Sequence, residues 1–223
     1  MTSTVVTAVI ALSAFGLAVS PITRRQPATE SDAHAVAGGP PDTLVVNPAA
    51  SSIRWNATGF GGRGARTGTV ALASGLFVIR HEQLTSGTFT IDMQSIDVTD
   101  IPATDVTARP RVRDQLRSVA FFDAERYPTS VFRSTGAKRV GPARWQIAGT
   151  LTMHGVTRPI AFETDVRWLE LGHMVATSTF TIDRRQWDVA SRGSGLATDL
   201  VDDAIQLSLT LDARRKRASV ATR

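Results

Sequence analysis

The chain has 223 residues, no cysteine and four histidines, and its formal net charge is +5. The length suits one domain of roughly 150 to 200 residues with extensions, or two small domains. The lack of cysteine excludes disulfides, thiolate zinc sites, iron–sulfur clusters and a cysteine nucleophile.

The amino end begins with a charge-free apolar run at residues 5–19. This run is short for a membrane span, which needs roughly 20 residues, and it fits the core of a signal peptide better. Arg24 and Arg25 follow it, so a short uncleaved anchor with a basic flank is an alternative, and a buried helix of the domain is a weaker one. Residues 26–42 are rich in Pro, Ala, Gly and Ser without periodicity. We therefore expect residues 1–42 to be a signal or anchor segment and a disordered linker on an exported protein.

From Leu44 onward, apolar and polar residues alternate with a period of two, which predicts strands with one buried face. Turn residues such as Ser86-Gly87 and His154-Gly155 separate the alternating runs, and these short breaks favour antiparallel hairpins. Alternation fails over residues 97–121, where residues 111–118 could form a short helix. The pattern predicts an all-β fold, an antiparallel up-and-down barrel of about eight strands with this excursion. A β-sandwich with a solid core is the alternative. The inward positions mix large and small side chains, which leaves either a cavity or a tightly packed core.

The body offers few candidates for chemistry. It holds none of the common catalytic or phosphate-binding motifs. The glycine cluster at residues 59–64 leads into a strand, and we interpret it as a hairpin loop or a mobile lid. The acidic pairs Asp97/Asp100 and Asp202/Asp203 are expected to be solvated. His154 lies in a turn, where it either bonds backbone groups or contacts a ligand.

Basic residues gather in two places. The arginines at positions 109, 111, 113 and 117 either pair with Asp105 and Asp114 or clamp an anionic head group over the barrel mouth. Residues 41–212 carry 18 Lys and Arg against 18 Asp and Glu, so the excess charge comes from residues 213–223. This basic tail is expected to be a solvated end, with contact to an anionic lipid or nucleic acid as the alternative. A balanced body argues against nucleic acid as the partner.

Five segments in order resemble the YceI-like family of lipocalin-like, polyisoprenoid-binding proteins. They are GTVALASG (68–75), GTFTIDMQSI (87–96), LRSVAFFDAERYPT (116–129), GTLTMHGVTRP (149–159) and IDRRQWDV (182–189). Two positions depart from the family pattern, which often has histidine where this chain has Arg66 and Gln115. The resemblance places the domain at residues 43–212, with residues 213–223 as tail. It implies an exported protein, in the periplasm or cell envelope or secreted, whose barrel encloses a long apolar tunnel.

The resemblance further implies that the protein binds and carries or sequesters an amphiphilic isoprenoid lipid, either a polyprenyl phosphate or an isoprenoid quinone. It implies no enzymatic activity, no metal and no cofactor apart from the bound lipid. The residues expected to line the tunnel are Ile53, Trp55, Phe77, Ile79, Phe89, Ile91, Met93, Phe132, Ile147, Leu151, Phe162 and Phe180. Candidate head-group contacts are Arg66, Arg117, His154 and Arg158. A membrane surface is a further expected partner, through the amino segment or the basic tail, and the protein could form oligomers. The alternatives are an envelope enzyme that uses His154 and nearby arginines, and a stress or interaction module that binds no lipid.

Overall fold

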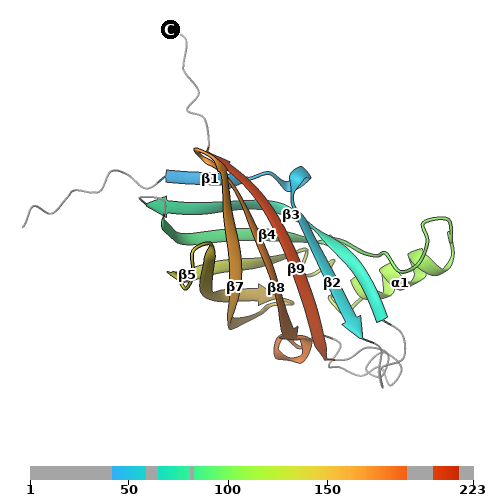
Figure 1. The fold of residues 1–223 in the computed structure, drawn as a ribbon. Helices are drawn as coiled ribbons and strands as arrows, with labels where there is room; N and C mark the ends of the chain where they lie inside the picture. Colours follow the sequence, from blue (N-terminus) through green and yellow to red (C-terminus); the bar gives the residue numbers. More distant parts are fainter. Residues whose placement is uncertain (1–41, 59–64, 81–82, 190–202, 216–223) are drawn as a thin grey trace, which may run out of the picture. The chain divides into compact units, whose positions relative to one another are not determined.

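The computed structural model describes residues 42–58, 65–80, 83–189 and 203–215 (Figure 1). The predicted leader and linker up to residue 41, the glycine cluster at 59–64, Asp202 and the predicted tail beyond Arg215 lie outside the described residues. Among the described residues, no helix is long and apolar enough to cross a membrane.

Eight antiparallel strands form a closed barrel, which confirms the predicted fold. Each strand pairs with the next in the chain, and β9 returns to pair with β2. One sheet that closes on itself has no pair of opposed edges, so the structure excludes the β-sandwich. The strands are β2 (Ser52–Thr58), β3 (Ala65–Arg80), β4 (Gln83–Val98), β5 (Thr129–Arg139), β6 (Arg144–Met153), β7 (Val156–Glu170), β8 (His173–Asp183) and β9 (Ala204–Arg215).

A ninth strand, β1 (Asp42–Val46), occupies the same position in the barrel as β2. Val45 of β1 pairs with Leu76 on β3 and with Arg214 on β9, the two strands that also flank β2. The short 3-10 helix η1 (Pro48–Ala50) separates the two pieces. Pro48, the first residue of η1, has no N–H to donate to a β-ladder. The Asn47 side chain caps η1 by accepting a hydrogen bond from the Ala49 N–H at 3.1 Å. β1 and β2 thus share one strand position of the barrel and lie one after the other between β3 and β9.

The two ends of the barrel differ in what covers them. At the helix end, where β2, β4, β6 and β8 end, lie α1 (Ala108–Arg117) and the 3-10 helix η3 (Arg184–Trp187) (Figure 1). At the terminal end, β1 begins and β9 ends, beside the turns that join β3 to β4, β5 to β6 and β7 to β8. The last strand runs to Arg215, three residues into the segment predicted as a tail, and Ala213 is fully buried.

The helix α1 confirms the expected excursion but begins three residues before the predicted start. Pro110 occupies its first turn, where backbone N–H groups have no intrahelical partner, so the proline costs the helix no hydrogen bond. Asp105 accepts the N–H groups of Ala108 at 2.7 Å and Thr107 at 3.1 Å, which fixes the start of the helix. None of its residues is buried.

Candidate functional site

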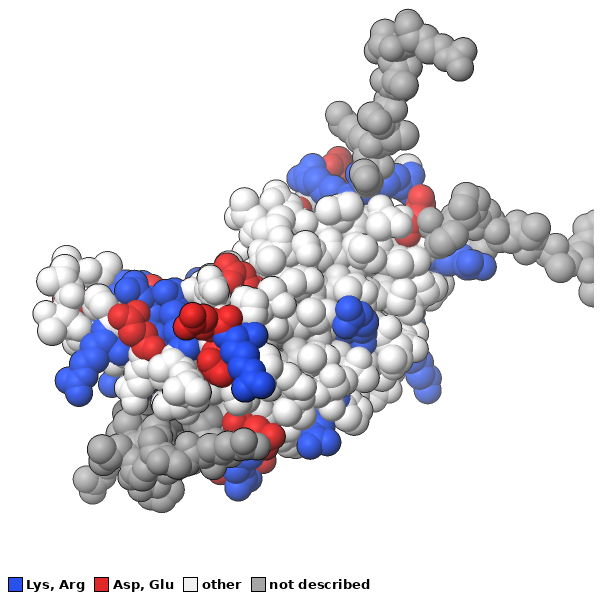
Figure 2. Space-filling model, turned by 180° about the vertical axis from the view of Figure 1, so that it is seen from behind, with Lys and Arg blue, Asp and Glu red and all other residues white. Residues whose placement is uncertain are grey.

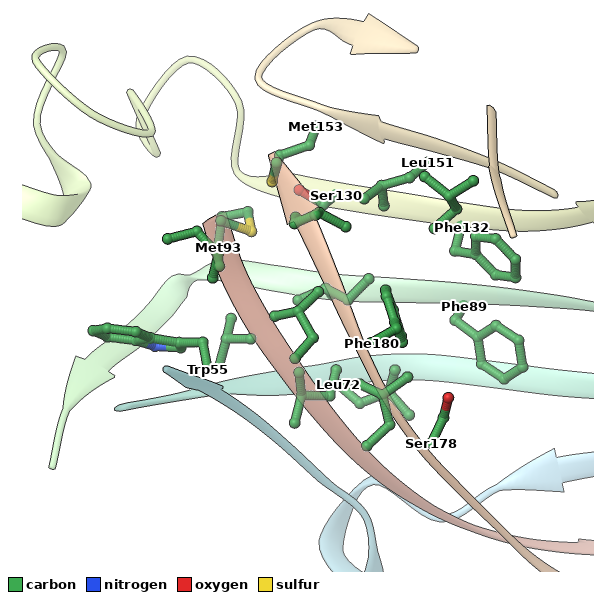
Figure 3. Close-up of a pocket in the computed structure, with 18 of the residues that line it drawn as sticks. Trp55, Leu72, Phe89, Met93, Ser130, Phe132, Leu151, Met153, Ser178 and Phe180 are labelled. Atoms are coloured by element: carbon green, nitrogen blue, oxygen red, sulfur yellow. The ribbon is translucent and has the colours of Figure 1, made fainter. Parts of the chain in front are cut away.

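The barrel encloses an apolar cavity of about 560 Å³, lined by side chains from all eight barrel strands and from α1. Figure 3 shows Trp55 and Met93 toward one side of the cavity, with Phe89 and Phe132 toward the other. The polar or charged residues in the lining are Arg66, Ser86, Gln115, Ser130, Ser134, Thr164, Ser178 and Arg184. All the other lining residues are apolar or glycine, so the interior suits a hydrocarbon and offers few hydrogen bonds.

Five phenylalanine rings form a belt along the cavity wall. The ring centroids of Phe77 and Phe89 lie 4.9 Å apart, and those of Phe89 and Phe132 lie 6.2 Å apart. Phe162 continues the series at 5.5 Å from Phe132 and 4.2 Å from Phe180. The belt therefore runs from β3 to β8 in steps that suit aromatic contact.

A glycine makes room for one ring of the belt. A Cβ at Gly149 would lie 2.5 Å from Cζ of Phe132 and 2.4 Å from the Arg133 carbonyl oxygen. Only a residue without a side chain lets the Phe132 ring lie against β6. The belt thus depends on a glycine that the hydrophobic pattern alone does not single out.

Eleven of the twelve residues expected to line the tunnel do line the cavity. The exception is Ile79, which lies in a small pocket at the terminal end beside Leu44 and Trp168. The placement of Ile79 therefore corrects the expectation from sequence. That the other eleven residues contact a ligand stays a prediction.

Sequence reasoning missed Val112 and Leu116 of α1, which lie four residues apart on the helix and reach the cavity. Apolar residues at that spacing share one face of a helix, and this spacing could have identified them. It also missed several aliphatic residues on the strands, among them Val70, Leu72, Leu207 and Leu209.

Backbone pairing between β7 and β8 covers only part of their length. Asp165 pairs with Thr177 and Glu170 with His173, while residues 156–164 of β7 have no partner on β8. Where the ladder ends, the Thr164 hydroxyl donates to the Thr177 carbonyl at 3.0 Å, and the Ser178 hydroxyl donates to the Glu163 carbonyl. Beyond this point the half-buried rings of Phe162 and Phe180 stack across the seam. Side chains, not backbone hydrogen bonds, close the wall there.

Of the four candidate head-group residues, the structure places only Arg66 in the cavity lining. Its Nη1 lies 2.7 Å from Oδ2 of Asp100, whose other oxygen accepts from the Thr67 N–H at 3.0 Å. Arg66 therefore brings a positive charge to the cavity at the helix end, with an acidic partner already beside it.

The other three candidates lie outside the lining. His154 sits in a left-handed turn with Gly155, and its Nδ1 lies 3.2 Å from the Trp187 carbonyl oxygen. Arg158 donates from Nε to the Gln186 carbonyl at 3.0 Å, so both residues tie the β6–β7 turn to η3. Arg117 has a buried Nε without a hydrogen-bond partner in the described part of the chain. A role for these three as head-group contacts stays a prediction.

The arginines of α1 do not line the cavity. Arg109 donates hydrogen bonds to Asp97 from Nη2 at 2.7 Å and from Nε at 3.2 and 3.4 Å, and this contact lowers the pKa of Asp97 below its ordinary value. Arg113 pairs with Asp114 at 3.2 Å as expected, whereas the expected partner Asp105 caps the helix. Figure 2 shows acidic and basic side chains mixed over the helix end beside a largely uncharged wall.

Arginines also hold the carboxylates considered for acid–base chemistry. Asp97 and Asp100 pair with Arg109 and Arg66. Asp203 lies 2.9 Å from Arg184 and 3.1 Å from Arg185. These three carboxylates are therefore engaged with cations, and Asp202 lies outside the described residues.

Comparison with known proteins identifies a matching family model and several similar proteins. The family model described as YceI-like domain matches residues 44–213. A UPF0312 protein of Pseudomonas putida is 42% identical over 48 residues, covering 22% of this chain and 25% of the relative. Protein YceI of Escherichia coli O157:H7 is 39% identical over 83 residues, covering 34% of this chain and 42% of the relative. The matched segments thus span less than half the length of these curated relatives.

Two solved structures share the fold. BcnA of Burkholderia cenocepacia aligns with a TM-score of 0.60 at 20% identity, over 75% of this chain and 98% of that one. A domain from Saccharophagus degradans, described as polyisoprenoid-binding and implicated in plant cell wall breakdown, aligns with a TM-score of 0.58 at 13% identity. It covers 79% of this chain and 100% of that domain. At these identities the likeness establishes the barrel fold.

Proposed function

Because the chain belongs to the family of YceI-like domains, we propose that it binds an amphiphilic isoprenoid lipid inside the barrel and carries or sequesters it. The observation that carries this proposal is the apolar cavity of about 560 Å³ in a closed barrel. A filled interaction module would have side chains in that space. The polyisoprenoid that the Saccharophagus degradans domain is described as binding belongs to the same ligand class.

The cavity volume limits how much of a lipid fits inside. At about 560 Å³ the cavity is in the size range of small-molecule sites, so it has room for part of a polyprenyl chain, and a tail too long for it would have to protrude. Burial of the tail contributes about 25 cal/mol for each Å² of apolar surface removed from water, and the tail therefore supplies most of the affinity.

The head group lies at the helix end in this proposal, because Arg66 brings a cation to the lining there and Gln115 adds an amide. A polyprenyl phosphate would compete with Asp100 for Arg66, whereas a quinone carbonyl would accept a hydrogen bond from either residue. The proposal therefore includes both ligands, the polyprenyl phosphate and the isoprenoid quinone. Binding is favoured over catalysis because the carboxylates and His154 at this end already hold arginines and backbone groups. The proposed role includes export of the protein, with residues 1–42 predicted as signal or anchor segment and linker.

The direct test is organic extraction of the purified protein followed by mass spectrometry, together with titration of prenols of increasing length. We expect an isoprenoid in the extract, and affinity that rises with each added isoprene unit until the tail fills the cavity and then levels off. Repeated recovery of no amphiphile, combined with no binding of any prenol or quinone, would reject the proposal.

A pair of variants on β9 separates cavity binding from surface adsorption. Leu207 lines the cavity, and its neighbour Gln206 is exposed on the outer face. Leu207→Trp should lower the bound lipid per protein because the indole occupies ligand space, while Gln206→Trp should leave it unchanged. Circular dichroism checks that both variants fold. Equal loss in the two variants would show that the lipid binds outside the barrel.

A further inference from the structure

The β7–β8 turn at the terminal end exposes large apolar side chains. Trp168 is 39% exposed, Leu169 47% and Leu171 83%. The other three tryptophans, Trp55, Trp145 and Trp187, are at most 9% exposed. Turn tips of soluble domains are usually polar. We call this cluster of Trp168, Leu169 and Leu171 the apolar tip, and exposed apolar clusters of this kind indicate a binding surface.

Basic residues flank the apolar tip. Arg167 precedes it and is exposed, and the last strand brings Arg214 and Arg215 to the same end. Trp168, Leu171 and Arg215 line one small surface pocket together with Asp42 and Glu170. Three acidic groups at this end are engaged, since Asp42 lies 2.7 Å from Arg215, and Glu170 and Asp212 each lie 3.7 Å from Arg214. Arg167, Arg214 and Arg215 balance these three, and the sequence then continues with Lys216 and Arg217 and no further acidic residue, so the excess charge of this part of the sequence is basic.

The chain outside the described barrel also joins it at this end. β1 begins at Asp42 and β9 ends at Arg215, and these two residues are bonded to each other. The apolar run at residues 5–19 is therefore tethered to the terminal end by residues 20–41, which span at most about 75 Å when extended. The basic tail leaves from the same place.

We propose that the terminal end docks on the surface of an anionic lipid bilayer, with the apolar tip inserted at the interface and Arg214 and Arg215 facing lipid phosphates. Tryptophan prefers the membrane interface because its ring is apolar and its N–H is polar. Leucines beside it reach the acyl chains, and adjacent arginines are attracted to anionic head groups. A second protein copy would not require the basic flank, and this charge favours a bilayer as the occupant.

Trp168 provides a local probe in the full chain, because the other tryptophans are buried. We would add vesicles of phosphatidylcholine alone, or mixed with phosphatidylglycerol, and subtract the emission of Trp168→Phe from that of the wild type. The expected result is a blue shift with the anionic vesicles, quenching by brominated phospholipid, and a loss of both as salt is raised. This local signal remains informative even when the leader itself adsorbs to the vesicles.

Two double variants test the assignment. Leu169→Ser with Leu171→Ser should raise the vesicle concentration for half-maximal shift by at least about tenfold. Val106→Ser with Val119→Ser serves as the matched control, since both valines are 80% exposed near α1, and it should leave the shift unchanged. Lipid binding in the cavity should be the same in both, so the result is independent of the proposed function.

Three outcomes would overturn the proposal. The first is no shift of Trp168 emission with anionic vesicles, and the second is an equal effect of the two double variants. The third is a concentration-dependent dimer in sedimentation that Leu169→Ser with Leu171→Ser abolishes, which would assign the apolar tip to a second copy instead.

Discussion

Buried strand residues close the terminal end of the barrel, whereas α1 covers the helix end without a buried residue of its own. Leu44, Met174 and Ala213 close the terminal end with at most 1% of their surface exposed. At the helix end, Trp187 and Val189 are equally buried, but α1 reaches the cavity only through the half-buried Val112 and Leu116. The β7–β8 ladder is formed toward the terminal end and missing toward the helix end. The contrast indicates that α1 can move away from the barrel at a lower free-energy cost than the buried residues of the terminal end.

The largest expected effect comes from the terminal end. Met174→Ala should lower the free energy of unfolding by about 2–5 kcal/mol, because it removes a fully buried side chain and leaves a void. Urea denaturation measures this loss. The neighbouring Val175, only half-buried, provides the control, and Val175→Ala should cost about 1 kcal/mol or less. Similar losses for the two variants would contradict the tight packing of Met174 at the terminal end.

A glycine near the helix end should give the next largest effect. A Cβ at Gly68 would lie 2.0 Å from the Asp97 carbonyl oxygen and 2.3 Å from Cζ2 of Trp55. Gly68→Ala should therefore cost about 1–3 kcal/mol of stability as β3 shifts away from both groups. Nothing lies within 4 Å of a Cβ at Gly136, so Gly136→Ala is the matched control. A near-neutral Gly68→Ala in urea denaturation would mean that β3 yields easily at this end.

Shortening a side chain of α1 should affect ligand exchange more than stability. Leu116→Ala should cost about 1 kcal/mol, because the side chain is only half-buried. Since it covers the cavity, its loss should speed the dissociation of bound prenol, measured by stopped-flow competition. Arg111→Ala on the exposed face of the same helix should leave the dissociation rate unchanged. If Leu116→Ala left that rate unchanged as well, the ligand would not leave past α1.

The smallest effect concerns the link between α1 and β4. Hydrogen bonds from Arg109 hold the pKa of Asp97 below its ordinary 3.8. A carboxyl with a lowered folded pKa contributes stability above its unfolded pKa and loses it as pH falls through the folded value. Asp97→Asn should therefore be less stable than the wild type at neutral pH, with the difference vanishing in acid. Thermal unfolding across this range measures it, and a difference independent of pH would assign the loss to something other than the ion pair.

Alternation in the sequence predicted the strands and most of the inward-facing residues, because side-chain direction in a strand depends on residue parity. It left a barrel and a sandwich both open, and the family resemblance favoured the barrel. The alternation predicts whether a side chain points inward, but it does not predict how far along the barrel axis the side chain lies. Ile79 shares the inward parity of Phe77, yet it lies at the terminal end beside Trp168 and below the cavity. The contacts of His154 and Arg158 with η3 join residues about thirty positions apart, and no local pattern indicates them. The helix was predicted to start at residue 111, directly after Pro110, whereas α1 begins at Ala108 because the first turn of a helix tolerates proline.

The bond between Asp42 and Arg215 joins the first and last described residues of the barrel at 2.7 Å. A domain whose ends lie on paired strands, as Leu44 of β1 and Arg215 of β9 do, can be cut elsewhere and rejoined there through a short link. The barrel is therefore suited to circular permutation, with a short linker from residue 215 to residue 42 and new ends opened in the turn at Gly141. For the same reason it could be placed inside a surface loop of another protein without forcing that loop apart.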